Sequence, residues 1–205
     1  VESGNLSDFS HSLLSSSPKD TETVFENEVL ALKINNKGGL LSEVKLKSFV
    51  NYDSVPVYLI KDGSSQLNLK FSTADKRTFE TVDLYFEPTL TKDGDAQFLS
   101  MKFKISETQY LAYNYTLNAN DYMVEFSIES KGLSTVFDSR QPAEFQWNLR
   151  ALRQDQSVSF ENRYTRLNYL HEGDKLNKLS QGGDDLEVIK DISWISYRQH
   201  FFSSI

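Results

Sequence analysis

The chain has 205 residues, no cysteine and a formal charge of −7. These totals exclude a disulfide framework, thiolate catalysis and cysteine zinc sites, and the negative charge gives no general attraction to phosphate backbones, so we predict no nucleic-acid binding. A chain of this length buries enough surface to fold without a metal or disulfide, and its 14 Phe and 10 Tyr favour β-strands.

The chain opens on a polar segment. It starts at Val1 and reads VESGNLSDFSHSLLSSSPKDTET, which is rich in Ser, Asp and Thr and has little periodicity. This composition is typical of a flexible linker, which we predict over residues 1–21. No apolar run of about 18 residues and no signal peptide are seen. Because the chain does not start with methionine and ends on an apolar stretch, we interpret it as the middle piece of a longer protein.

From Val24 onward, apolar residues alternate with polar ones. The segments QFLSMKFKI, YLAYNYTL, YMVEFSIES and EFQWNLRAL each have an apolar side chain at every second position. This period predicts half-buried antiparallel strands, which we expect to form one cooperative unit up to about Leu170. The residues predicted to share a face are Met101, Phe103 and Ile105; Leu111, Tyr113, Tyr115 and Leu117; Tyr122, Val124, Phe126 and Ile128; and Phe145, Trp147, Leu149 and Ala151.

Turn residues separate these segments. NNKGG, KDGSS, KDGDA and NAND, at residues 35–39, 61–65, 92–96 and 118–121, contain the residue types that tolerate positive φ or form Asx turns. Short strands at such spacing are typical of a sandwich rather than of βαβ units. We therefore predict an all-β, antiparallel β-sandwich over residues 22–190, with no internal repeat.

Residues suited to catalysis or metal binding are few. HEGD, which begins at His171, resembles half of a zinc-protease motif, but the second His is missing and the glycine would break the required helix, so we predict a solvated loop. NKGG fits a hairpin turn better than a phosphate cradle. Two acidic pairs fit turns better than calcium loops, namely Asp93 with Asp95 and Asp184 with Asp185. We predict no catalytic residue, no metal and no cofactor.

Four arginines gather in the segment RALRQDQSVSFENRYTR. Clustered arginines hold carboxylates or phosphates through paired hydrogen bonds, which indicates a possible docking patch. The alternative is that they occupy solvent-facing strand positions, because Asp155 and Glu161 lie among them. The residues of this patch are Arg150, Arg153, Arg163 and Arg166.

The chain ends on the aromatic stretch WISYRQHFFSSI. Its apolar residues fall at offsets that fit one face of a helix, so we predict a short amphipathic helical segment over residues 191–205. It either packs on the sandwich and leads toward a membrane, forms an ordinary core helix, or is a disordered end. The residues predicted to contact a membrane interface or a partner are Trp194, Ile195, Tyr197, Arg198, Phe201 and Phe202.

Taken in order, these segments resemble the periplasmic domain of the YidC family, the bacterial membrane protein insertases. FENEVLALKINNKGGLLSEVKLKSF is similar to the opening of that domain, and YLIKDGSSQLNLKF, DLYFEP and YTLNANDYMVEFSI are similar to its later strands. WISYRQHFFSSI resembles the stretch before the second transmembrane helix. The resemblance covers about residues 22–205, and the NKGG and KDG turns suggest a Bacteroidetes-like member.

The resemblance implies a large twisted β-sandwich, the supersandwich related to galactose mutarotases. It places residues 1–21 after the first transmembrane helix and residues 191–205 before the next one, at the periplasmic face of the bacterial inner membrane. The implied function is that of a non-enzymatic, membrane-tethered accessory domain and chaperone in protein transport. Its implied partners are Sec translocon components (SecD/SecF, SecY) and nascent membrane proteins.

Two alternatives stay open at this point, a carbohydrate-binding or aldose-epimerase-like β-sandwich and a secreted adhesive β-protein. The family's insertion chemistry belongs to its membrane helices, so no functional residue transfers to this chain. Shared fold with mutarotases transfers no activity either.

Overall fold

The computed structural model describes residues 21–180 and 186–205. The predicted linker, apart from Thr21, and the pair Asp184 and Asp185 lie outside the described residues. The described residues form 15 strands, one short α-helix and one 3-10 helix, η1 (Thr81–Asp83). The predicted all-β, antiparallel architecture is therefore confirmed.

The strands form four antiparallel sheets. The first contains β1 (Glu22–Glu26), β2 (Leu30–Asn35), β3 (Leu40–Val50) and β4 (Pro56–Ile60), in that order. The second has the order β10-β9-β8-β7, with β7 (Glu87–Asp93), β8 (Ala96–Ser106), β9 (Gln109–Leu117) and β10 (Val124–Lys131). The third has the order β11-β5-β6, with β5 (Ser65–Ser72), β6 (Thr78–Glu80) and β11 (Glu144–Leu149). The fourth has the order β13-β12-β14-β15, with β12 (Arg166–His171), β13 (Lys175–Ser180), β14 (Ile192–Arg198) and β15 (Ser203–Ser204).

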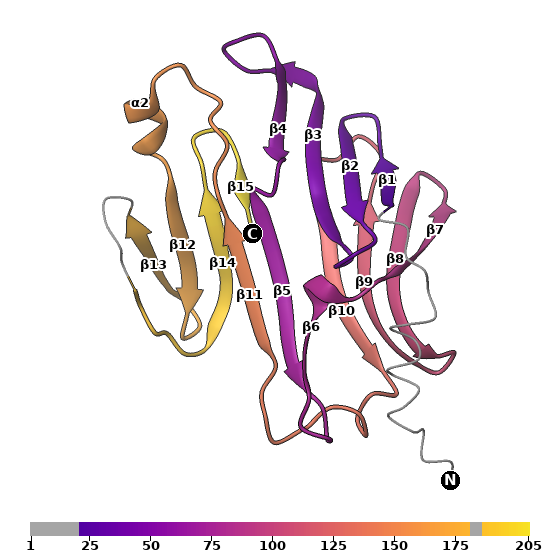
Figure 1. Cartoon of the computed structure of the whole chain (residues 1–205). Helices are drawn as coiled ribbons and strands as arrows, with labels where there is room; N and C mark the ends of the chain where they lie inside the picture. Colours follow the sequence, from indigo (N-terminus) through magenta and orange to yellow (C-terminus); the bar gives the residue numbers. More distant parts are fainter. Residues whose placement is uncertain (1–20, 181–185) are drawn as a thin grey trace.

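The first three sheets contribute side chains to one apolar core in a sandwich-like arrangement. The β7–β10 sheet lies behind and beside the β1–β4 sheet (Figure 1). The fully buried Leu32 of β2 and Met101 of β8 belong to the same cluster of core residues, which also includes Phe71 of β5. Burial of large apolar side chains is the main term that stabilises such an arrangement.

The alternation predicted for the central strands is confirmed. Met101 and Phe103 of β8 are buried, as are all four predicted residues of β9, whereas Ile105 near the end of β8 is half-buried. The pattern weakens at β10, where Phe126 and Ile128 are each 37% exposed. β10 is an edge strand of its sheet, so its inward side chains have neighbours on one side only.

The NNKGG segment forms the predicted turn between β2 and β3. Gly38 and Gly39 have φ angles of 85° and 69°, which non-glycine residues rarely adopt. The buried Tyr115 hydroxyl donates a hydrogen bond of 2.8 Å to the Gly39 carbonyl oxygen. Burial also raises the pKa of Tyr115, so the hydroxyl keeps the proton that this bond requires. The turn is thereby tied to the opposite sheet.

The predicted helix over residues 191–205 is wrong, because β14 and β15 occupy this segment. Its apolar residues fit both periods, but Trp194, Ile195 and Tyr197 are β-branched or aromatic and favour strands. Pairing with β12 favours the strand, because β12 forms backbone hydrogen bonds with this segment, whereas an isolated helix of this length is only marginally stable in water. The α-helix that the described residues do contain is α2 (Val158–Asn162), where the Ser157 side chain accepts a hydrogen bond from the Phe160 amide.

Within the described ranges, no helix has both the length and the apolar character needed to cross a bilayer.

Candidate partner-docking site

The two sets of residues predicted to contact partners meet at β14. Successive side chains of a strand point to opposite faces, so Tyr197 and Arg198 lie on different faces of the sheet. Tyr197 faces a hollow that Arg150 also lines. Arg198 lies directly opposite Arg166 of β12. One member of each predicted set is therefore present on each face.

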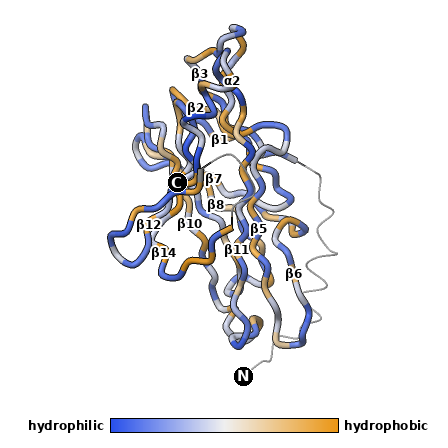
Figure 2. The backbone as a smooth tube through the Cα atoms, turned by 90° about the vertical axis from the view of Figure 1, so that its left-hand side faces the viewer, coloured by the Kyte–Doolittle hydropathy of each residue, from blue (hydrophilic) through white to orange (hydrophobic). Residues whose placement is uncertain are grey.

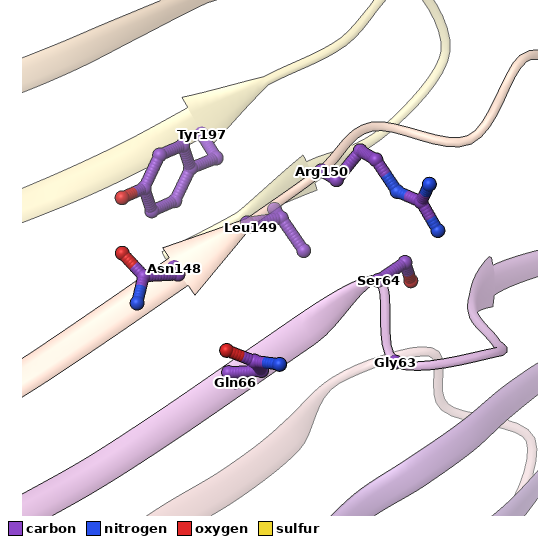
Figure 3. Close-up of a pocket in the computed structure, with 7 residues that line it drawn as sticks. All are labelled: Gly63, Ser64, Gln66, Asn148, Leu149, Arg150 and Tyr197. Atoms are coloured by element: carbon purple, nitrogen blue, oxygen red, sulfur yellow. The ribbon is translucent and has the colours of Figure 1, made fainter.

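The hollow has a volume of about 370 Å³ and lies where β5, β11 and β14 come together (Figure 3). Asn148 of β11 pairs in register with Gln66 of β5, which brings their carboxamides to the same face. The lining residues are Gly63, Ser64, Gln66, Asn148, Leu149, Arg150 and Tyr197.

Hydrogen bonds hold the walls of the hollow in place. The Tyr197 hydroxyl donates to the Trp147 carbonyl oxygen at 2.9 Å, and the two rings meet edge to face at a centroid distance of 4.8 Å. Burial raises the pKa of Tyr197, which favours the protonated hydroxyl that donates this bond. On the other wall, the Arg150 amide donates to the Ser64 carbonyl oxygen at 2.7 Å. The Ser64 hydroxyl in turn accepts from the Lys61 amide at 3.0 Å.

Three polar groups of the hollow are available for a ligand. The carboxamides of Gln66 and Asn148 and the guanidinium of Arg150 have no hydrogen bond or ion pair with any described residue. Carboxamides pair with peptide N–H and C=O groups, and a guanidinium binds carboxylates or phosphates. The hollow is thus suited to bind a polar or acidic segment of another molecule.

The other arginines of the predicted patch lie outside this hollow. Arg153 donates to the backbone oxygens of Asp155, at 2.9 Å, and of Gln156, and it lies 5.1 Å from the centre of the Tyr52 ring. Arg163 caps the C-terminus of α2, and Arg166 begins β12. Arg150 therefore lines the hollow without the other three arginines, and their joint docking role stays a prediction.

The aromatic residues at the chain's end differ in exposure. Phe201 is 58% exposed and contacts the ring of His200 at 4.1 Å, whereas Phe202 packs against the core. Trp194 is 38% exposed, and Ile195 is half-buried. Partner contact by these residues also stays a prediction, and Phe202 already has a structural role.

His171 is not in the solvated loop that we predicted. It ends β12, is buried, and its Nε2 atom lies 3.1 Å from the Asn177 side-chain nitrogen. The turn begins only at Glu172, so strand pairing with β13 extends one residue further than the sequence suggested. The predicted turn between β7 and β8 is present, with Asp93 as the last residue of β7 and Asp95 within the turn. No cluster of three potential metal ligands occurs among the described residues.

Tyr197→Phe is expected to lower the free energy of unfolding by about 0.5–1.5 kcal/mol, because it removes the hydrogen bond to the Trp147 oxygen but keeps the ring. Urea denaturation measures the change. The control is Tyr122→Phe, an exposed tyrosine for which we expect no measurable change. Equal effects in both variants would show that the Tyr197 hydroxyl does not connect β14 to β11.

Comparison with known proteins gives a consistent result. The family model of the YidC periplasmic domain matches residues 22–204. The chain is similar to the membrane protein insertase YidC of Parabacteroides distasonis, with 34% identity over 89% of the chain and 29% of that protein. It is also similar to the YidC of Porphyromonas gingivalis, with 32% identity over 87% of the chain and 28% of that protein.

A third relative, the YidC of Azobacteroides pseudotrichonymphae, is 30% identical over 92% of the chain and 31% of that protein. The chain thus spans less than a third of the length of these curated relatives. No solved structure matches the chain.

Proposed function

The chain belongs to the family of YidC periplasmic domains, the extracytoplasmic part of a membrane protein insertase, and from this membership we propose that it is a non-catalytic accessory domain that docks partners of the insertase. The match of the family model to residues 22–204 is the observation that supports this most directly. The domain acts at the periplasmic face of the bacterial inner membrane, where it supports insertion and folding.

The hollow between β5, β11 and β14 is the docking site in this proposal. Three polar side chains with no partner among the described residues line it, and hydrogen-bonded neighbours fix its walls, so binding requires little ordering of the domain. The partners are Sec translocon components (SecD/SecF, SecY) or nascent membrane proteins. The carbohydrate-binding and aldose-epimerase alternatives are not proposed, because the relatives are named as insertases.

The proposal predicts that a photo-crosslinking amino acid at Gln66 of the full-length insertase attaches to one of these named partners. The same probe at Asp95, in the turn between β7 and β8 of another sheet, is the control and is expected to give no such product. Antibodies against the named partners identify the products.

Arg150→Ala is expected to reduce the crosslink at Gln66 about 10- to 100-fold, because a hydrogen bond to a charged group contributes about 1.5–3 kcal/mol. Arg77→Ala, which removes an arginine that pairs with Asp75 elsewhere, is the charge-matched control. Equal yields from Gln66 and Asp95, or a yield unaffected by Arg150→Ala, would contradict docking at the hollow.

A further inference from the structure

The face of β14 opposite the hollow presents three rows of side chains across the fourth sheet. Strand register places directly paired residues on one face. The first row is Leu176, Leu170 and Trp194; the second is Lys178, Asn168 and Ser196; the third is Arg166, Arg198 and Ser203. Figure 2 turns this edge of the molecule, with β12 and β14, toward the viewer.

The charge of these rows differs from that of the chain. The chain as a whole has 29 acidic and 22 basic residues. The rows contain Lys178, Arg166 and Arg198 and no acidic side chain. Glu187, which accepts a hydrogen bond from Tyr169, is bonded to a residue of the other face. The face is thus locally basic on an acidic domain.

Arg166 and Arg198 are directly opposite each other on adjacent strands. Like charges in this position repel and destabilise a sheet. Neither guanidinium has a hydrogen bond or ion pair with a described residue. The Ser203 side chain, paired with Arg198, adds a hydroxyl donor to the same row. A bound anion would therefore reduce the repulsion between the two arginines and accept hydrogen bonds from Arg166, Arg198 and Ser203.

The opposite end of the face is apolar and open to solvent. Leu176 is 63% exposed and Trp194 is 38% exposed, and half-buried Leu170 lies between them. Arg198 follows Trp194 by four positions along the strand, a rise of about 13 Å. Exposed Trp and Leu beside Arg and Lys match the interface of a bilayer, where rings and aliphatic groups enter the headgroup region and basic groups reach phosphates.

We propose that this face, formed by β12, β13 and β14, binds the surface of a bilayer that contains anionic phospholipids. Arg166 and Arg198 hold headgroup phosphates, and Trp194 and Leu176 enter the interfacial region. A protein partner would explain the arginines, but the separation of an apolar row from a basic row fits a layered bilayer surface better. This goes beyond docking at the hollow, because it orients the domain so that the hollow, on the other face of β14, stays accessible.

The test measures vesicle binding by the full 205-residue chain. The chain contains two tryptophans, so Trp147→Phe leaves Trp194 as the single fluorescent reporter. With vesicles of equal phosphatidylglycerol and phosphatidylcholine we expect co-sedimentation and a blue shift of Trp194 emission. Brominated lipid chains should quench it. Vesicles of phosphatidylcholine alone should produce neither change.

Arg166→Gln with Arg198→Gln is expected to weaken vesicle binding roughly 30-fold, at about fivefold for each basic residue near an anionic surface. Lys92→Gln with Lys131→Gln removes the same charge from the second sheet and is expected to change binding less than twofold. Leu176→Ser should reduce the Trp194 blue shift, because the apolar row loses a member that enters the interface.

Thermal unfolding of the arginine double variant provides a readout independent of lipid. Because the double variant removes the repulsion between Arg166 and Arg198, we expect its Tm to be unchanged or higher. A lower Tm would show that the arginines have a partner within the domain, and it would overturn the proposal. Equal binding to both vesicle types, no binding to either, or equal losses in the arginine and lysine double variants would also overturn it. None of these results depends on the crosslink at Gln66, so the two proposals fail separately.

Discussion

Gly39→Ala is expected to lower the free energy of unfolding by about 2–5 kcal/mol. Gly39 has a φ of 69°, where an L-residue costs about 1–2 kcal/mol. An added Cβ would also lie 2.9 Å from Cγ of Phe86 and 3.1 Å from Cδ2 of Tyr113. These buried rings stack at 4.9 Å and cannot move aside freely, which adds about 1–3 kcal/mol of overpacking.

Gly63→Ala separates the two contributions. Gly63 also has a φ of 69°, but an added Cβ there would meet no atom within 4 Å. We therefore expect a loss of only about 1–2 kcal/mol for this variant. Urea denaturation of both variants gives the comparison. If the two losses are equal, the close approach of the β2–β3 turn to Phe86 and Tyr113 contributes nothing to stability.

The central strands could be predicted because local pattern and tertiary structure agree there. In β9, the large side chains of Leu111, Tyr113, Tyr115 and Leu117 occupy alternate positions, and both neighbouring strands are present to bury them. The sequence of β10 alternates just as regularly, but its position at an edge, and hence the exposure of Phe126, depends on sheet order. Local pattern contains no information on which strand lacks a neighbour.

The end of the chain shows where the pattern is ambiguous. The spacing of Trp194, Ile195, Phe201 and Phe202 fits one face of a short helix. The same residues also fit the observed arrangement, in which strand β14, a tight turn and the short strand β15 follow one another. The choice depends on β12, which supplies the pairing partner. The β-branched and aromatic content of the segment favours a strand, whereas the spacing of its apolar residues favours a helix.

The candidate site could be predicted in part. Arg150 and Tyr197 were both identified from the sequence, but 47 positions separate them, and only the approach of β11 to β14 brings them to one hollow. Gln66 and Asn148 were missed. Each is an ordinary polar residue on a strand, and their meeting follows from the β5–β11 register, which joins segments far apart in the chain.

Phe71→Ala is expected to lower the free energy of unfolding by about 3–5 kcal/mol, because it leaves a cavity in a closely packed aromatic cluster. Phe71 is 5% exposed, and its ring lies 4.7 Å from that of Phe137 and 5.9 Å from that of Phe79. Phe137 belongs to the segment that crosses from β10 of one sheet to β11 of another. The crossing therefore depends on this contact.

Backbone hydrogen bonds fix the same crossing to β5. The Asp138 amide donates to the Ser72 oxygen at 2.9 Å, and the Ala74 amide donates to the Val136 oxygen at 2.9 Å. Without the Phe71 ring, these hydrogen bonds are less shielded from water. We therefore expect amide hydrogen exchange to accelerate more at residues 133–138 than in β8 and β9. Phe98→Ala is the control, since that ring is 40% exposed and its loss should cost less than about 1 kcal/mol. If exchange accelerates equally across all strands, Phe71 stabilises the sandwich as a whole rather than the crossing to β11.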